Sequence, residues 1–320
     1  MRCFKSLVTF LFGSWLAIPA HAASAQDWLQ RLADAERQQS FQGTFVYERN
    51  GSFSTHSVRH RVEEGGGTRE RFLQLDGSAQ EIVRVDGQVT CVSGALVDQL
   101  ANGQVWPARE LDVEQLAEWY DLRMIGESRV AGRQTVVLAL LPRDQHRYGI
   151  ELHLDQQSGL PLKSLLLNDK GQLLERFQFT QLDTETVPTT EALQPTAGCE
   201  PLPVVPAQEK AETVWHSDWL PPGFTLSAVI ERRSPASDEL VAGLVYGDGM
   251  ARFSVFLEPL RGALVEDARS QLGPTVAVSR RLSTSDGDVM VTVVGEIPLG
   301  TAERVALSMR SAGTGTQVSP

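Results

Sequence analysis

The sequence predicts an α+β protein of two unequal parts, a large N-terminal curved antiparallel sheet over helices and a smaller α+β C-terminal domain. Three observations predict this fold. Apolar and polar residues alternate with a period of two over most of residues 41–182, turn dipeptides such as Asn50-Gly51 separate the alternating runs, and a proline-rich segment divides the 320-residue chain. The composition, 42% hydrophobic and 22% charged, is that of a globular protein and excludes a disordered chain.

Residues 1–22 have the pattern of a cleaved secretory signal peptide. Arg2 and Lys5 precede an apolar run, and Ala20-His21-Ala22 supplies an A-x-A cleavage site. The apolar run is about 12 residues long, which is short for a membrane span. Without this segment the chain has 27 basic and 40 acidic residues, a charge of −13. That charge disfavours nucleic-acid binding, because it repels phosphate.

Two cysteines, Cys91 and Cys199, stay after Cys3 is removed with the signal peptide. An oxidising compartment allows a disulfide between them, which would tie the proline-rich segment to the first domain. Two free or buried thiols are the alternative.

Residues 23–183 form the large domain in this reading. Ser24 and Asp27 make a capping pattern before an amphipathic helix that carries Trp28, Leu32 and Ala35 on one face and ends near Gln39. Alternating strands follow, with one further helix at 113–120 that Asp112 caps. A curved sheet wrapped over these helices, as in a half-open β-barrel, buries its apolar face and leaves room for a concave apolar pocket.

Residues 184–212 contain five prolines and are predicted to be a stiff, extended linker. The small domain then covers residues 213–312, and 313–320 form a tail. Strands are predicted at 224–232, 240–246, 251–257 and 289–294. A helix is expected from Ala302 to Arg310, capped by Thr301.

Motifs of known catalytic or cofactor chemistry are missing from the sequence. It contains no G-x-S-x-G, H-E-x-x-H, C-x-x-C or phosphate-binding loop. We therefore expect no enzyme activity, no cofactor and no metal, with an exported hydrolase of an unfamiliar type as the alternative.

Aromatic and apolar residues are the candidates for binding. Those of the large domain are candidate lining of a lipid pocket, with plain core packing as the alternative: Phe45, Tyr47, Phe72, Trp106, Trp119, Tyr120 and Met124. Those at the start of the small domain are a candidate partner surface, because interfaces favour tryptophan and arginine: Trp215, Trp219, Phe224, Arg232 and Arg233. A plug over the small sheet is the alternative for these aromatics, and ordinary exposed strand residues are the alternative for the arginines.

Several segments together resemble the MucB/RseB family, and their order and spacing extend over nearly the whole mature chain. They are 147–155 with 158–164, 219–224, 245–249 with 253–260, and 291–298. The resemblance implies a large domain similar to the LolA/LolB lipoprotein carriers. It also implies a periplasmic negative regulator of an envelope-stress sigma factor.

Such a regulator would bind the periplasmic domain of a membrane anti-sigma factor and shield it from site-1 proteolysis. Lipopolysaccharide, other lipid-bearing envelope molecules or mislocalised lipoproteins would release it. A periplasmic lipid or lipoprotein carrier is the alternative function, and a homo-oligomer stays open.

Overall fold

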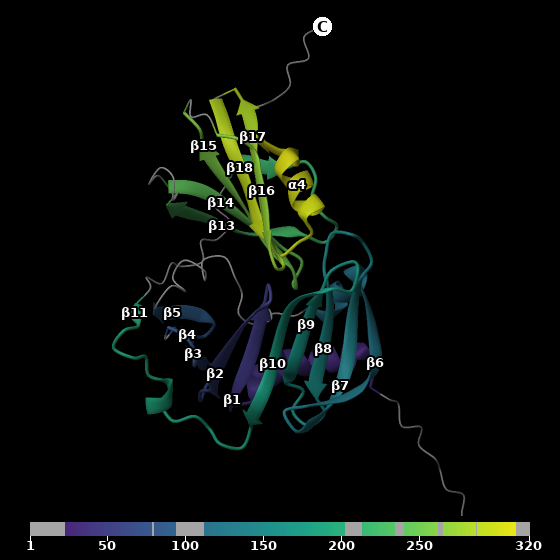
Figure 1. Ribbon diagram of the computed structural model, residues 1–320, viewed down its shortest axis with the longest axis vertical. Coiled ribbons are helices and arrows are strands. Elements are labelled where there is room, and N and C mark those ends of the chain that lie inside the picture. The colour runs from purple at the N-terminus through teal and green to yellow at the C-terminus, as the bar shows by residue number, and fades with distance from the viewer. Residues whose placement is uncertain are drawn as a thin grey trace, which may run out of the picture.

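The computed structural model describes residues 23–78, 80–93, 112–201, 213–233, 240–261, 265–285 and 287–311. These residues form two domains, each built on its own antiparallel sheet (Figure 1). The prediction of a mostly antiparallel protein with few helices and a large, unclosed sheet is confirmed.

The large sheet has eleven strands within the described residues, in the order β11-β5-β4-β3-β2-β1-β10-β9-β8-β7-β6. β11 and β6 form its two edges, so the barrel stays open. The strands are β1 (Phe41–Arg49), β2 (Ser52–Val62), β3 (Thr68–Gln74), β4 (Glu81–Val85), β5 (Gln88–Ser93), β6 (Tyr120–Val130), β7 (Arg133–Pro142), β8 (Gly149–Asp155), β9 (Pro161–Leu167), β10 (Leu173–Asp183) and β11 (Glu200–Pro201).

The turn between β1 and β2 shows why local sequence predicts this sheet. Asn50 and Gly51 both have positive φ, 53° and 73°, which is the backbone of a two-residue hairpin turn.

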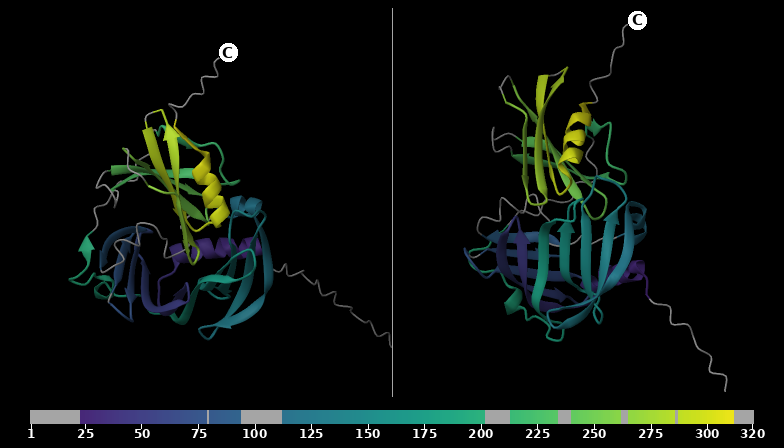
Figure 2. Two further views of the ribbon diagram at one scale, coloured as in Figure 1. Left: turned by 45° about the horizontal axis from the view of Figure 1, so that its top comes forward. Right: turned by 45° about the vertical axis from the view of Figure 1, so that its right-hand side comes forward.

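The helices of the large domain lie on the concave side of the sheet, which curves around α1 (Figure 2). α1 (Ala25–Gln38) begins with the predicted capping box of Ser24 and Asp27, and Asp112 caps α3 (Val113–Trp119). The apolar face of α1 packs on β7 and β8 through these buried residues: Trp28, Leu29, Leu32, Leu138, Leu140, Leu152 and Leu154. Burial of each such leucine contributes about 1.5–3 kcal/mol.

The leucines just named, with Trp28, form the leucine-rich cluster. A second apolar cluster, called here the phenylalanine-rich cluster, occupies the concave face of β1, β2, β3 and β10. Phe45 of β1 lies at its centre, with ring centroids 4.7 Å from Phe177 and 6.0 Å from Phe179 on β10. Phe72 of β3 and Ala35 at the end of α1 complete the contact. This cluster and the leucine-rich one together fill the inside of the curved sheet.

The segment after β10 crosses the outer face of the large sheet as a strap, here residues 184–201. Arg61 Nη1 on β2 donates to the Pro188 carbonyl at 3.1 Å. One strand further, Arg71 Nη1 donates at 3.1 Å to the Ala192 carbonyl, within the short 3₁₀ helix η1 (Glu191–Leu193). The first half of the predicted linker is therefore attached to the large domain.

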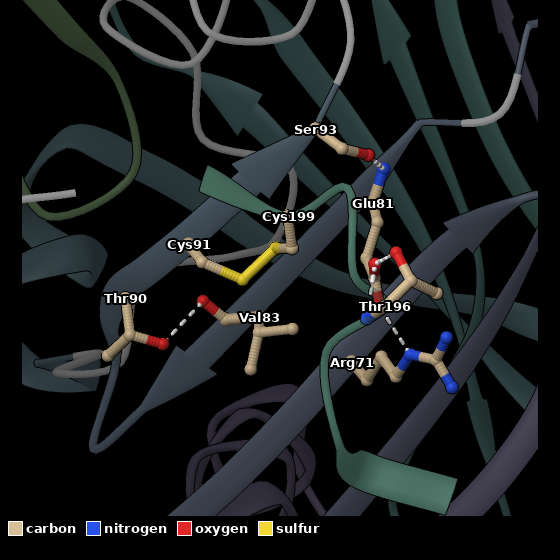
Figure 3. Close-up of a disulfide and its surroundings, with 8 residues drawn as sticks. All are labelled: Arg71, Glu81, Val83, Thr90, Cys91, Ser93, Thr196 and Cys199. Atoms are coloured by element: carbon tan, nitrogen blue, oxygen red, sulfur yellow. Dashed lines mark hydrogen bonds and ion pairs between the residues drawn. A yellow bond between two sulfur atoms is a disulfide. The ribbon is translucent and has the colours of Figure 1, made fainter. Parts of the chain in front are cut away.

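The end of the strap is fixed on β4 and β5 (Figure 3). The carboxylate of Glu81 accepts hydrogen bonds from the Thr196 hydroxyl at 2.5 Å and from the Thr196 amide at 3.1 Å. A disulfide then joins Cys91 of β5 to Cys199, with 5.6 Å between the Cα atoms. β11 follows at once and pairs with β5, so strap and sheet edge are held together covalently.

The small domain is mostly sheet, which corrects the α+β prediction. Its six-stranded sheet has the order β13-β14-β15-β18-β17-β16, and a two-stranded ribbon pairs β12 with β19. The strands are β12 (Trp215–Ser217), β13 (Thr225–Arg233), β14 (Leu240–Gly247), β15 (Arg252–Pro259), β16 (Ala268–Leu272), β17 (Thr275–Thr284), β18 (Gly287–Gly295) and β19 (Met309–Ser311). The sequence reading missed β12, β16, β17 and β19.

One helix covers this sheet, α4 (Leu299–Ser308), whose Ala302, Val305 and Ala306 pack into the core of the small domain. The predicted cap at Thr301 is wrong, because the helix begins earlier, after Pro298. Thr301 lies in the first turn instead, where its hydroxyl faces the large domain.

Candidate functional site

The small domain sits over one end of strands β7–β10 of the large sheet (Figure 1). Several long-range polar contacts cross the junction between the domains.

Arg147, in the loop between β7 and β8, is the centre of the junction. Its side chain is 0% exposed, and its Nε donates at 2.5 Å to the equally buried carboxylate of Asp248, in the turn between β14 and β15. The same guanidinium also bonds Asp144 and the Pro222 carbonyl. A buried charge is tolerated only when it is paired in this way, so the loop and both small-domain turns have fixed relative positions.

Aromatic rings surround this guanidinium on both sides of the junction. Its central carbon lies 5.4 Å from the Trp119 ring, 5.8 Å from Tyr120 and 5.0 Å from Phe224 of the small domain. Cation–π attraction adds to the pairing with Asp248. Gly223 passes so close to the Trp119 indole that a Cβ atom there would collide with it.

Next to Arg147, two neighbouring residues extend the junction. The Tyr148 hydroxyl donates to the Ile297 carbonyl at 3.0 Å, and His146 Nδ1 lies 3.0 Å from the Thr301 hydroxyl of α4. The His146 ring also meets the Trp219 ring edge-on at 5.0 Å. Burial lowers the pKa of His146, which favours its neutral ring.

A second polar cluster joins the domains at the end of β1. Arg49 donates to the Glu296 carboxylate at 2.9 Å and bonds the Thr275 hydroxyl, both in the small domain. Its Nε is 3.8 Å from Glu175 of β10, which accepts a 2.6 Å hydrogen bond from the Tyr47 hydroxyl. Two carboxylates share one guanidinium here, as Asp144 and Asp248 share that of Arg147, but the side chains of the Arg49 cluster are partly exposed, whereas Arg147 and Asp248 are fully buried.

A groove of about 1010 Å³ opens between the outer face of β6–β9 and the start of α4. Its floor is apolar and includes Ile125, Ala139, Leu141 and Leu167, and Arg304 of α4 is on the opposite wall. Ile125 is 52% and Leu141 39% exposed. Exposed large apolar side chains in a concave surface are typical of a binding site.

The candidate lipid-pocket residues divide between core and surface. Phe45 and Phe72 belong to the phenylalanine-rich cluster, and Tyr47 packs against it. Tyr120 belongs to the leucine-rich cluster, and Trp119 lies at the domain junction, beside Arg147. Met124 is 44% exposed on the edge strand β6. Trp106 lies outside the described residues. The structure therefore does not bring the six candidates that it describes into one pocket.

The candidate partner residues Trp215, Trp219 and Phe224 pack on the core of the small domain, and Phe224 is buried in it. The central carbon of the Arg304 guanidinium also lies over the Trp219 ring, 3.8 Å from the ring centroid. Arg232 and Arg233 are at the end of β13, and their side chains lie outside the described part.

Sequence reasoning missed the residues that join the domains, above all Arg147, Asp248, Arg49 and Glu296. A signal was present, because Arg147 and Asp248 fall within two of the segments that carry the family resemblance. Their pairing was invisible, since the partners are 101 and 247 positions apart.

Among the described residues, no group of three or more His, Cys, Asp or Glu side chains is placed to hold a metal ion. None of the helices described is long and apolar enough to cross a membrane.

Comparison with known proteins gives matches over both domains. The model of the MucB/RseB N-terminal domain matches residues 24–197, and that of the MucB/RseB C-terminal domain matches residues 209–310. The sigma factor AlgU regulatory protein MucB of Pseudomonas aeruginosa is 66% identical over 301 residues, which cover 94% of this chain and 95% of the relative.

Solved structures of MucB agree with the fold to different degrees. A crystal structure of MucB in complex with MucA(peri) has a TM-score of 0.79 at 66% identity, and a crystal structure described as MucB, with no partner named, has 0.70 at 64%. Each comparison covers 90% of this chain and 98% of the other.

Proposed function

This chain belongs to the MucB/RseB family, and we propose that it is a periplasmic negative regulator of an envelope-stress sigma factor. Residues 1–22 would direct its export to the periplasm and would then be cleaved. It would act by binding the periplasmic domain of a membrane anti-sigma factor. The observation that carries this proposal is its likeness to MucB, a sigma factor regulatory protein solved in complex with MucA(peri).

The groove at the domain junction is the docking surface that the geometry favours. It combines an apolar floor on the large domain with a wall from α4 of the small domain, so a partner segment in it would contact both domains. Tight interfaces have this anatomy, in which a few apolar side chains enter a concave, desolvated centre. A bound segment would be shielded from a protease, because a protease must have its substrate extended and accessible.

Lipid would release the partner by binding a conformation in which the interior of the large domain is opened. Phe45, Phe72 and Tyr120 are buried in this conformation, so an acyl chain would enter only a different, opened conformation. Each buried CH₂ contributes about 0.8 kcal/mol. A lipid that prefers the opened form would weaken partner binding by the free-energy difference between the two forms.

Calorimetric titration with MucA(peri) tests the docking surface. The wild-type chain is expected to bind, and Leu141→Arg is expected to weaken binding at least about tenfold, because a charge would enter the apolar floor. Leu307→Arg is the matched control: Leu307 is 62% exposed on α4 and does not line the groove. Equal binding by Leu141→Arg would exclude the groove, and a wild-type chain that does not bind would contradict the proposed function.

Two additions to the same complex test its consequences. A site-1 protease is expected to cleave free MucA(peri) and to spare the bound form. Lipopolysaccharide added to the complex is expected to restore cleavage. Cleavage that is equally fast with and without the regulator would contradict the shielding step, and an intact complex at saturating lipopolysaccharide would contradict release by lipid.

A further inference from the structure

The Arg49 cluster and the Arg147 cluster each combine one guanidinium with two carboxylates, but they differ in their exposure to solvent. Arg147 and its partner Asp248 are fully buried, and the second partner of Arg147, Asp144, is 22% exposed. Arg49 has Glu175 and Glu296 within reach, from opposite sides of the junction. The side chains of Arg49, Glu175 and Glu296 are 28%, 22% and 33% exposed, so protons can reach this cluster.

The cluster is also connected to the interior of the large domain. Phe45, Tyr47 and Arg49 alternate along β1, so all three side chains are on the concave face. Their cross-strand neighbours on β10 are Phe179, Phe177 and Glu175 in the same order. The Tyr47 hydroxyl donates to Glu175, which links the phenylalanine-rich cluster to the domain junction by direct contact.

We propose that Glu175, Arg49 and Glu296 form a proton-controlled latch between the two domains, closed when Glu175 carries a proton and loosened when it ionises. In the closed form the protonated Glu175 keeps its hydrogen bond with Tyr47, and Arg49 is left to pair with Glu296 across the junction. After ionisation, two negative carboxylates compete for one guanidinium, and separating the domains lets water solvate them. The Arg147–Asp248 pair would then act as the hinge, because both of its side chains are fully buried.

The raised pKa values of the two glutamates support a junction that closes in acid and loosens at higher pH. Burial, followed by repulsion from Glu296, raises the pKa of Glu175 from 4.5 to about 7. Burial also raises the pKa of Glu296, although Arg49 opposes this. A carboxyl whose pKa is raised in the closed form stabilises that form at low pH. This contribution is lost as pH rises from about 4.5 to about 7.

Other titratable groups face the cluster and were considered for the same role. Tyr47 has a pKa raised by burial and by Glu175, so it stays protonated in this range. His56 of β2, with its ring centroid 6.5 Å from that of Tyr47, has a pKa lowered by burial, which favours its neutral form. Burial and the negative charges of Glu296 and Asp169 raise the pKa of Tyr148. Its hydroxyl donates a hydrogen bond to the Ile297 carbonyl. Tyr47, His56 and Tyr148 therefore do not supply a contribution that tightens the junction in acid.

The latch can be tested on the full mature chain by spin labels across the junction. The labels are attached at Ser52→Cys, in the β1–β2 hairpin, and at Gln271→Cys, in the β16–β17 hairpin, and both positions are exposed. The tips of the two hairpins meet where Gly273 approaches Arg49 and Asn50. Pulsed electron–electron distance measurements at pH 5.5 and pH 8 report the arrangement. We expect one short distance at pH 5.5, and at pH 8 a closed-to-open ratio at least about tenfold lower, because each unit of pKa shift is tenfold in that equilibrium.

Glu175→Gln mimics the protonated acid and is expected to keep the pH 5.5 distance at both pH values. Glu127→Gln, at an exposed acid of β6 outside the cluster, is the matched control and is expected to keep the wild-type response. A wild-type distance distribution that is identical at the two pH values would overturn the proposal, as would a full response in Glu175→Gln.

A second measurement does not depend on the folding of any variant. Carbon-13 NMR of the side-chain carboxyls in the wild-type protein is expected to show one glutamate that titrates near pH 7. If every glutamate titrates below about pH 5.5, the latch does not exist.

Discussion

Arg147 of the large domain and Asp248 of the small domain form an ion pair from which solvent is excluded on both sides. The two residues are 101 positions apart, and neither belongs to a helix or strand. Asp248 also accepts from the amides of Met250 and Ala251, at 2.9 Å and 2.7 Å, which holds its turn ready for the guanidinium. The position of one domain on the other thus depends in part on contacts between two loops.

Arg147→Ala is expected to lower the free energy of unfolding by about 3–5 kcal/mol, because it leaves the Asp248 carboxylate buried without its partner. Urea denaturation of the mature protein measures this. Arg123→Ala is the control, since its pair with Asp121 is exposed and its loss is expected to cost less than about 1 kcal/mol. Equal effects of the two substitutions would contradict the assigned role of Arg147.

The disulfide predicts a large effect of reduction on the large domain. Cys91 and Cys199 close a loop across 108 positions, and a cross-link of that span restricts the unfolded chain by about 4–5 kcal/mol. Urea unfolding of the Cys91→Ser/Cys199→Ser double variant is expected to show a loss of this order, and reduction of the wild type should reproduce it. A wild type whose stability is unchanged by reductant would show that the strap is held by its hydrogen bonds alone.

A side chain at Gly223 would test sterically whether the two domains are in contact at Trp119. Gly223 has φ of +82°, and an added Cβ would collide with Trp119. Gly223→Ala is therefore expected to destabilise the protein by more than the 1–2 kcal/mol or so that the backbone conformation alone costs. Gly249→Ala is matched to it, because Gly249 has φ of +97° and open space around it. The same loss of melting temperature in both variants would mean that the domains are not in contact at Trp119.

Acid is expected to weaken the large domain through Asp155. Burial would raise the pKa of Asp155, but hydrogen bonds from Arg133 and Ser158 outweigh it and the pKa is lowered from 3.8. A lowered carboxyl pKa stabilises the fold above the ordinary value, and this stability is lost as pH falls below about 4. Thermal unfolding between pH 2.5 and 6 should show this loss, with a shallower acid limb in Asp155→Asn. An acid limb that the substitution leaves unchanged would argue against the Arg133–Asp155 pair as its source.

Lowering the pH is expected to have opposite effects at Asp155 and at Glu175, in separate pH ranges: it destabilises the fold through Asp155 and stabilises the closed junction through Glu175. The Asp155 contribution disappears only in strong acid, whereas the proposed latch at Glu175 tightens as pH falls from 7. Global unfolding therefore reports Asp155, and the distance between the domains reports Glu175.

Much of the fold was predictable because its signals are local. Ser24 and Asp27 cap a helix through atoms three residues apart, and Asn50-Gly51 closes a hairpin through its own backbone. Strand alternation and these turns were enough for the large curved sheet. The prediction failed where a local signal competed with a tertiary one: Thr301 has the chemistry of a cap, but α4 begins before it and its hydroxyl faces His146.

The sequence by itself determined the alternation, the turns, the helix caps and the family resemblance, all of which depend on neighbouring residues or on ordered segments. Only the tertiary structure decided which residues meet across the strap and the domain junction. It joined Cys91 to Cys199, placed Arg147 on Asp248, and brought Arg49 to Glu296, 247 positions away. Such pairs depend on the register and curvature of a whole sheet, because a slip of one residue turns every side chain of a strand to the other face. No short stretch of sequence contains that information.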